Sequence, residues 1–311
     1  MIGSVLVEEL LSRNGCNLVL IVRDEAKAKA KFAKWIDQDR ISIVKGELGT
    51  GVVPKVDGRI DAIFHLASTT HPKAYAEQPI STIMMNVMAT QGLLEIAASN
   101  PGCRFVYASS VEVYGRNRGD VELFDEKYCG YIDPNTLRAG YPESKRCGEA
   151  LCQAYLKEKG VDFVIARIAR VYGPTLSRTD TKAASQFIRN AMDGKDIVLK
   201  SDGNQYFSYL HVSDAVSGLI TVWQKGVVGE AYNVADGASD IKLKDLAALI
   251  AGNAGRKVVF DLPDAVEAAG FSTATVARLD SSKLKALGWA PQYDIASGIR
   301  ETMEELRKAG W

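Results

Sequence analysis

The sequence lacks an excess of charge of either sign and lacks a long apolar run. Its 311 residues carry 38 Lys and Arg against 38 Asp and Glu, which leaves a formal net charge of zero at pH 7. A neutral chain has no general attraction to nucleic acid or to an anionic membrane. No run approaches the 18 or so apolar residues that span a bilayer. The sequence therefore predicts neither a nucleic-acid partner nor a membrane partner.

Cysteine and histidine are also scarce. Five cysteines, none in a CxxC pair, and three histidines argue against a disulfide framework and against a metal site. Glu8 and Glu9 interrupt the stretch where a signal peptide would need an unbroken apolar segment, which predicts a cytoplasmic protein.

What the chain does contain is a regular alternation of short apolar runs and segments of helical period. This pattern predicts a parallel sheet wrapped by crossover helices, an α/β doubly wound Rossmann fold. The expected strands are Leu18–Val22, Ile41–Val44, Ala62–Leu66, Phe105–Ser109 and Phe163–Ile168, and the expected helices are Ser4–Asn14, Glu25–Trp35, Ile83–Ser99 and Glu143–Lys159.

The rhythm changes after Gly173 and Pro174, where loops lengthen and short extended pieces mix with helices. We expect a dinucleotide-binding domain over residues 1–172 and a smaller substrate-binding lobe over 173–311. A strand-like segment, Glu230–Ala235, could return to the large sheet, so residues of about 210–236 are expected to complete the first domain and interleave the two parts.

The chain opens on a helix where such a sheet normally begins with a strand and a glycine-rich turn. Gly3 corresponds to the third glycine of a GxxGxxG fingerprint, and the two earlier glycines are missing. The first domain is thus expected to be incomplete at its N-terminus. Either the native protein starts upstream of Met1, which we favour, or the chain is a relative that has lost dinucleotide binding.

Tyr141 and Lys145 are four residues apart and share a face of the expected helix. A cation beside a phenol lowers the phenol pKa, which would let Tyr141 exchange a proton with a sugar hydroxyl or carbonyl. Ser110 ends an apolar strand 31 residues earlier, at the edge of the sheet where ligands bind in this fold class, and could donate a hydrogen bond to the reacting oxygen.

These residues resemble the extended short-chain dehydrogenase/reductases that act on nucleotide sugars, the NAD-dependent epimerases/dehydratases. The resemblance extends over nearly the whole chain and rests on several motifs together. They are Ile2–Ser4, Phe64–Ala67, Asn86–Thr90, Ser109–Gly115, Tyr141–Lys145, Arg167–Pro174, Tyr209–Ala215 and Leu287–Trp289.

The resemblance implies that Ser110, Tyr141 and Lys145 form the catalytic set and that Lys145 also holds the nicotinamide ribose. It implies that Asn86 and Ala67 line the cofactor groove, that the substrate is a nucleotide sugar, and that the expected helices 83–99 and 143–159 form a homodimer interface.

Glu112 matches a glutamate that 4,6-dehydratases and UDP-glucuronate decarboxylases carry, and it joins the expected catalytic set. Val111 stands where dehydratases have an aspartic acid, which argues against 4,6-dehydration. Arg170 and Phe207 replace the asparagine and the arginine that usually reach the diphosphate. We expect Arg170, Phe207 and Arg278 to line the substrate pocket, with the Arg170 guanidinium binding phosphate.

The expected strand Leu18–Val22 ends in Val22 and is followed by Arg23. Members of the family that prefer NAD carry an acid at the end of the corresponding strand. Arg23 suits a 2′-phosphate and Lys27 offers a second contact, so the sequence favours NADP(H) over NAD(H).

The leading hypothesis is an NAD(P)-dependent enzyme of the epimerase/dehydratase type that acts at a ring carbon, C4, of a nucleotide sugar. An NADPH-dependent 4-keto-sugar reductase and a UDP-glucuronate decarboxylase-like enzyme remain alternatives. From another class, the chain could be a non-catalytic dimeric binding protein, although its Ser110, Tyr141 and Lys145 argue against this.

Overall fold

The computed structural model describes residues 1–13, 15–69, 75, 77–261 and 275–311. Its largest sheet has four parallel strands in the order β3-β4-β5-β9. These strands are β3 (Ala62–His65), β4 (Arg104–Ser110), β5 (Asp162–Ile168) and β9 (Ala231–Val234). β9 pairs with β5, so the segment predicted to return to the large sheet does so. The predicted α/β fold with a parallel sheet is confirmed.

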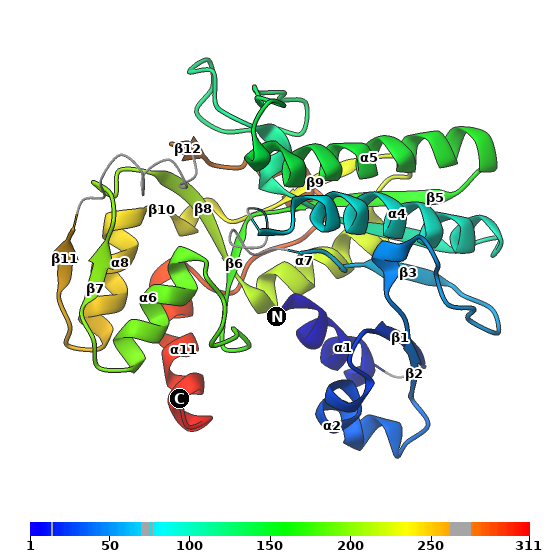
Figure 1. The fold of residues 1–311 in the computed structure, drawn as a ribbon, viewed down its shortest axis with the longest axis horizontal. Coiled ribbons are helices and arrows are strands. Elements are labelled where there is room, and N and C mark those ends of the chain that lie inside the picture. Colours follow the sequence, from blue (N-terminus) through cyan, green and yellow to red (C-terminus); the bar gives the residue numbers. More distant parts are fainter. Residues whose placement is uncertain (14, 70–74, 76, 262–274) are drawn as a thin grey trace.

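Apolar side chains along β4 and β5 point alternately to the two faces of this sheet, which explains why helices cover both faces. Phe105, Tyr107 and Phe163 contribute to a core beneath α4 (Pro79–Ala98) and α5 (Gly140–Lys159). Val106 and Val164 point the other way, into a second core that includes residues of α7 (Val212–Lys225). Figure 1 shows α4 and α5 side by side along one face and α7 along the other.

The N-terminal part forms a separate pair of parallel strands, β1 (Leu18–Val22) and β2 (Ile41–Lys45), in register Leu18 with Ile41. The helices α1 (Ile2–Ser12) and α2 (Glu25–Ile36) flank this pair. Within the described residues no strand joins β1 to β3. One edge of β1 and one edge of β3 are therefore unpaired among these residues. In Figure 1, β1, β2 and α2 lie to one side of the main body.

The second half of the chain forms smaller sheets around β8 (Tyr206–His211), which pairs with β6 (Arg170–Tyr172), β10 (Asp240–Lys242) and β12 (Val276–Ala277). A short parallel pair, β7 (Ile197–Leu199) with β11 (Val258–Phe260), lies further out. Besides α7, the described helices of this half are α6 (Ala183–Met192), α8 (Leu243–Asn253), α10 (Ser282–Lys285) and α11 (Ile295–Lys308).

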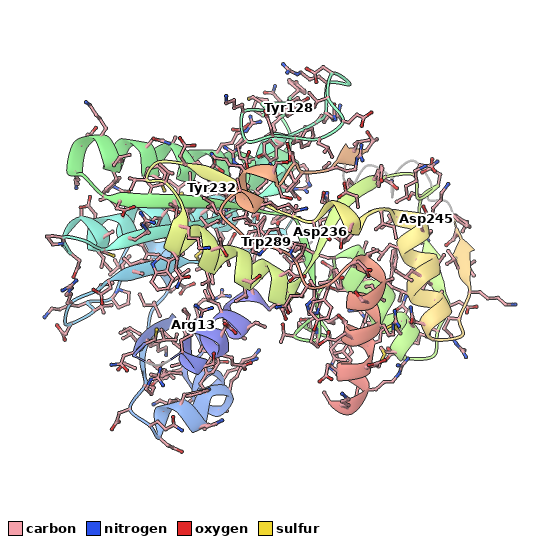
Figure 2. The ribbon with its side chains drawn as sticks, turned by 180° about the vertical axis from the view of Figure 1, so that it is seen from behind. Arg13, Tyr128, Tyr232, Asp236, Asp245 and Trp289 are labelled. Atoms are coloured by element: carbon pink, nitrogen blue, oxygen red, sulfur yellow. The ribbon has the colours of Figure 1, made fainter. Side chains whose placement is uncertain are left out.

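The second half is tied back to the first through Trp289, whose Nε1 donates to the Ser217 hydroxyl of α7 at 3.0 Å. Figure 2 shows Trp289 and Asp236 between the two halves, with Arg13 on the N-terminal unit. The division into domains at residue 172 remains a prediction. None of the described helices is both long enough and apolar enough to cross a bilayer.

Candidate active site

The catalytic residues predicted from the sequence lie where the central strand β4 meets helix α5. Ser110 is the last residue of β4, and Tyr141 and Lys145 lie on the first two turns of α5. Because neighbouring strands are parallel, their carboxyl ends share one edge of the sheet, and α5 begins at that edge. The side chains of Tyr141 and Lys145 are both buried.

Tyr141 is enclosed by a stacked aromatic ring and by charged neighbours. The Tyr75 ring stacks on it at 4.8 Å between centroids, and the Arg138 guanidinium lies over Tyr75 at 5.1 Å. Burial, followed by the charge of Glu112, raises the Tyr141 pKa to about 12, against the opposing effect of a hydrogen bond with Ser110. The phenol is therefore protonated at neutral pH in this structure.

This outcome corrects the expected depression of the Tyr141 pKa by Lys145. The Lys145 Nζ donates to the Ala108 carbonyl at 2.9 Å and lies 4.9 Å from the centroid of the Tyr107 ring. The Lys145 charge thus interacts with the β4 backbone, and burial of the Tyr141 phenol is the main influence on the Tyr141 pKa. Burial also lowers the pKa of Lys145 to about 8, partly offset by Glu149, so the ammonium form persists at pH 7.

Asn86 of α4 connects the two sides of the site through hydroxyl groups. Its Nδ2 donates to Ser144 Oγ at 2.8 Å, and its Oδ1 accepts from Ser68 Oγ at 2.7 Å. Ser144 in turn donates to the Tyr141 carbonyl at 2.8 Å. Asn86 is fully buried, so this network fixes the start of α5 against α4 and against the segment that follows β3.

Glu112 belongs to the same charged cluster. It lies in a 3-10 turn, Val111–Tyr114, and accepts from Arg138 Nη2 at 2.8 Å. Arg138 lies in another such turn, Leu137–Ala139, which leads directly into α5. The predicted Glu112 therefore stands near Tyr141, already paired with a cation.

The residues expected to hold a dinucleotide lie on the N-terminal side. Gly3, on the first turn of α1, is next to Leu66, since a Cβ there would be 3.8 Å from Leu66 Cδ1. Ala67 follows Leu66. Arg23 lines a surface hollow of about 530 Å³ together with Lys29 and Lys45. Asp24 and Glu25 line the same hollow, and Glu25 pairs with Lys29 at 2.5 Å, so Arg23 and Lys45 are the cations left for the phosphate of a dinucleotide.

The side chain of Lys27 does not line this hollow. Its backbone N–H instead bonds to the Asp24 carboxylate at 2.9 Å, which caps α2. Lys45 does line the hollow, because β1 and β2 are parallel and end side by side, and the contact of Lys27 with the cofactor stays a prediction.

The expected substrate residues are on two sides of β8. Arg170 of β6 lies 3.6 Å from the centroid of the Phe207 ring, whereas Arg278 lies 4.5 Å from that of Tyr206. Tyr206 and Phe207 are consecutive in a strand, so their side chains point to opposite faces. The structure thus brings Arg170 and Phe207 together and places Arg278 across the strand from them, near Asp240 at 3.9 Å.

Several residues of the site carried no signal that sequence reasoning could use. Ser68 and Tyr75 reach Asn86 or Tyr141 only through the tertiary fold, and so does the bond between Ser144 and Asn86. Ser144 and Arg138 are close to the Tyr141 motif in sequence, which was the one available hint.

Comparisons with known proteins agree with this geometry. A profile of the NAD dependent epimerase/dehydratase family matches residues 1–235. UDP-glucuronic acid decarboxylase 3 of Arabidopsis thaliana is 30% identical over 311 residues, covering 98% of this chain and 86% of the relative. UDP-glucuronic acid decarboxylase 1 of Xenopus tropicalis is 28% identical, covering 99% of this chain and 70% of the relative.

Two solved structures are similar over the whole chain. The UDP-glucose 4-epimerase of Thermotoga maritima, crystallised with UDP-glucose, has a TM-score of 0.84 at 20% identity and covers 100% of this chain and 97% of its own. The dTDP-glucose 4,6-dehydratase of Streptomyces venezuelae, crystallised with NAD, has a TM-score of 0.82 at 25% identity, with coverages of 100% and 95%. The chain therefore belongs to the NAD dependent epimerase/dehydratase family, which consists of enzymes of the extended short-chain dehydrogenase/reductase type.

Proposed function

We propose that this protein oxidises a ring carbon, C4, of a nucleotide sugar by hydride transfer to a nicotinamide cofactor. The observation that carries the proposal is the convergence of Ser110, Tyr141 and Lys145 at the carboxyl edge of β4 and the start of α5. The named substrates of the relatives and solved structures, UDP-glucuronic acid and UDP-glucose among them, support a nucleotide sugar.

Tyr141 is the group that exchanges the proton. When bound, the nicotinamide supplies the hydride acceptor, and Gly3, Ala67, Asn86 and Lys145 are the residues that would hold it. With a pKa of about 12, Tyr141 carries its proton before reaction and can protonate the oxygen of a keto sugar.

For the proposed oxidation, Tyr141 must first release its proton to solvent, and the phenolate that then accepts the proton of the sugar hydroxyl must gain stabilisation. The Lys145 ammonium can supply it by leaving the Ala108 carbonyl and turning toward the phenol. Ser110 orients the reacting oxygen by a hydrogen bond. The site therefore holds both a proton donor and the cation that can convert it into a base.

A variant pair on one helix tests this proposal. Tyr141→Phe removes the proton carrier and should lower kcat by about 10²- to 10⁴-fold. Tyr155→Phe on the same helix is the matched control, because its hydroxyl donates to Glu95, on the outside of the helix pair. It should keep kcat within about twofold, as expected for a position outside the site. Equal effects of the two substitutions on turnover of UDP-glucuronate or UDP-glucose would contradict the proposal.

We further propose that NADP(H) is preferred to NAD(H). Arg23 and Lys45 support this preference, because a 2′-phosphate adds two negative charges where an acid would otherwise meet the ribose. Asp24 and Glu25 also line the hollow, and Glu25 already pairs with Lys29. Stoichiometric consumption of NADPH during turnover would favour the 4-keto-sugar reductase over an epimerase that regenerates its cofactor.

A UDP-glucuronate decarboxylase-like reaction is the second candidate. Its support is Glu112, which stands beside Tyr141 in this structure, together with the decarboxylases among the relatives. Release of carbon dioxide from UDP-glucuronate distinguishes it from epimerisation, which retains the acid.

Homodimerisation and a cytoplasmic location stay predictions. Ile80 and Met84, four residues apart on α4, are 77% and 40% exposed, and this apolar surface supports pairing through α4 and α5. Sedimentation of the chain and of Met84→Glu tests the dimer, since a buried charge at the interface should shift the protein to monomers.

A further inference from the structure

The active site carries a positive charge that the described residues do not neutralise. Arg138 and Arg170 both lie close to Glu112, and Glu112 pairs with Arg138 alone, at 2.8 Å. The Nη1 atoms of both arginines are shielded from solvent and have no hydrogen-bond partner among the described residues. Two guanidiniums therefore share one carboxylate and present two free donors.

Such an arrangement is unfavourable without a further anion. A guanidinium withdrawn from water loses several kcal/mol of hydration unless a partner replaces that hydration. Burial and the charge of Arg138 both lower the pKa of Arg170, which reflects the same lack of an anionic partner. The Phe207 ring, 3.6 Å away, holds the guanidinium flat but cannot accept hydrogen bonds as an oxygen does. An incoming carboxylate would satisfy both nitrogens.

The place of these arginines indicates which part of a nucleotide sugar they meet. Glu112 and Arg138 are near enough to Tyr141 to shift its pKa, and both also act on Arg170. With C4 of a hexopyranose at Tyr141, C6 is attached to the adjacent ring carbon, whereas the diphosphate on C1 is across the ring. Arg278, on the other face of β8, lies 3.9 Å from Asp240 and has a buried Nε without a partner among the described residues, which leaves that donor for the diphosphate.

We propose that Arg138 and Arg170 bind the C6 carboxylate of a nucleotide-linked uronic acid, so that the site selects acidic sugars over neutral ones. This inference rests on the proposed function, because it takes C4 to lie at Tyr141. It assigns Arg170 a role in sugar specificity in place of the phosphate contact expected from the sequence.

Binding calorimetry tests this assignment without relying on turnover. The titrants are UDP-glucuronate, UDP-glucose and UDP, and the protein is the full chain carrying Tyr141→Phe, which prevents conversion of the ligands. We expect UDP-glucuronate to bind at least about tenfold more tightly than UDP-glucose. Arg170→Asn should abolish that difference and leave the affinities for UDP-glucose and UDP within about threefold.

Two further variants control for folding and for general charge. Arg170→Lys keeps a cation and should retain part of the preference, provided that thermal unfolding shows a folded protein. Arg256→Gln removes an exposed arginine whose Nη1 donates to the Gly194 carbonyl, far along the second half of the chain. It should leave all three affinities unchanged.

The opposite results overturn the assignment. Equal losses for all three titrants in Arg170→Asn would place Arg170 on the diphosphate. No preference for UDP-glucuronate in the parent protein would remove the carboxylate site altogether, even if Arg170→Asn fails to fold. Failure of the proposed function is a separate result, since it appears as an undiminished kcat in Tyr141→Phe, whereas failure here appears in the ratio of affinities.

Discussion

The strands beside the predicted catalytic residues differ from those beside the proposed cofactor phosphate site in how completely the fold supports them. β4 and β5 are each paired on both sides, and most of their residues are buried. β1 and β2 are paired only with each other within the described residues, and Ile41 is their one fully buried residue. A two-stranded unit of this kind is marginally stable by itself and relies on the helices packed against it. The proposed proton chemistry thus falls on the more buried part of the sheet, and the proposed phosphate binding on a less buried part.

Hydrogen exchange should show the largest difference between these regions. Because opening of β1 and β2 disrupts few buried contacts, their amides should exchange about 1,000-fold faster than those of β4 and β5, equivalent to about 4 kcal/mol. Mass spectrometry of exchanged peptides from the folded chain provides the measurement. Similar protection in both pairs of strands would mean that the N-terminal unit is as firmly held as the central sheet.

Acid should weaken the central sheet through His65. This buried residue ends β3 and lies 3.0 Å from Thr90 Oγ1 through its Nε2. Burial, followed by the Lys145 charge, lowers its pKa to about 3. The unfolded chain binds this proton near pH 6.5, so the free energy of unfolding should fall as the pH drops from 6.5 toward 3. The fall should be roughly 4 kcal/mol by pH 3.

Urea unfolding at several pH values measures this slope. In His65→Gln the fall between pH 6.5 and 3 should be clearly smaller than in the parent. An unchanged slope would show that His65 is not the group responsible.

The contact between α5 and the central sheet should tolerate little added volume. A Cβ on Gly148 would overlap the Tyr107 hydroxyl, so Gly148→Ala should reduce the free energy of unfolding by roughly 2 kcal/mol. Gly252→Ala on α8 is the matched control, because a Cβ there meets nothing within 4 Å, and it should be neutral or stabilising. If both substitutions behave alike in urea unfolding, α5 is not tightly seated on β4.

The smallest effect concerns the cofactor phosphate. Arg23→Gln and Lys45→Gln should each weaken NADP⁺ binding by about tenfold and leave NAD⁺ binding nearly unchanged. Lys27→Gln should change neither affinity appreciably, since that side chain does not line the hollow. Calorimetric titration of the three variants checks this order. A loss confined to Lys27→Gln would restore the interpretation made from the sequence.

The sequence predicted several single elements closely because the signals that mark them are local. The run Leu18–Val22 is bounded by polar residues at both ends and forms β1 over those same residues. Helix α5 starts at Gly140, three residues before the predicted Glu143, because the turn at Leu137–Ala139 leads directly into it. Periodicity identifies the body of a helix better than its first turn.

Long-range contacts account for what the sequence did not predict. Lys45 reaches the phosphate hollow because β2 lies beside β1, which no local pattern encodes. The pKa of Tyr141 was expected to fall because Lys145 is four residues away, but the Ala108 carbonyl binds the ammonium and burial raises the pKa instead. Spacing along a helix places two side chains close together, whereas the surrounding fold determines which neighbouring group a charged side chain contacts.

A single-turnover experiment with UDP-glucuronate deuterated at C4 tests the central claim most directly. The chain is mixed with NADP⁺ and the labelled sugar nucleotide, and the nicotinamide is followed by absorbance and by mass. The account predicts reduced nicotinamide that carries the deuterium, formed by the parent and by Tyr155→Phe but not by Tyr141→Phe. Reduced nicotinamide without deuterium, or its formation at an equal rate in Tyr141→Phe, would contradict it.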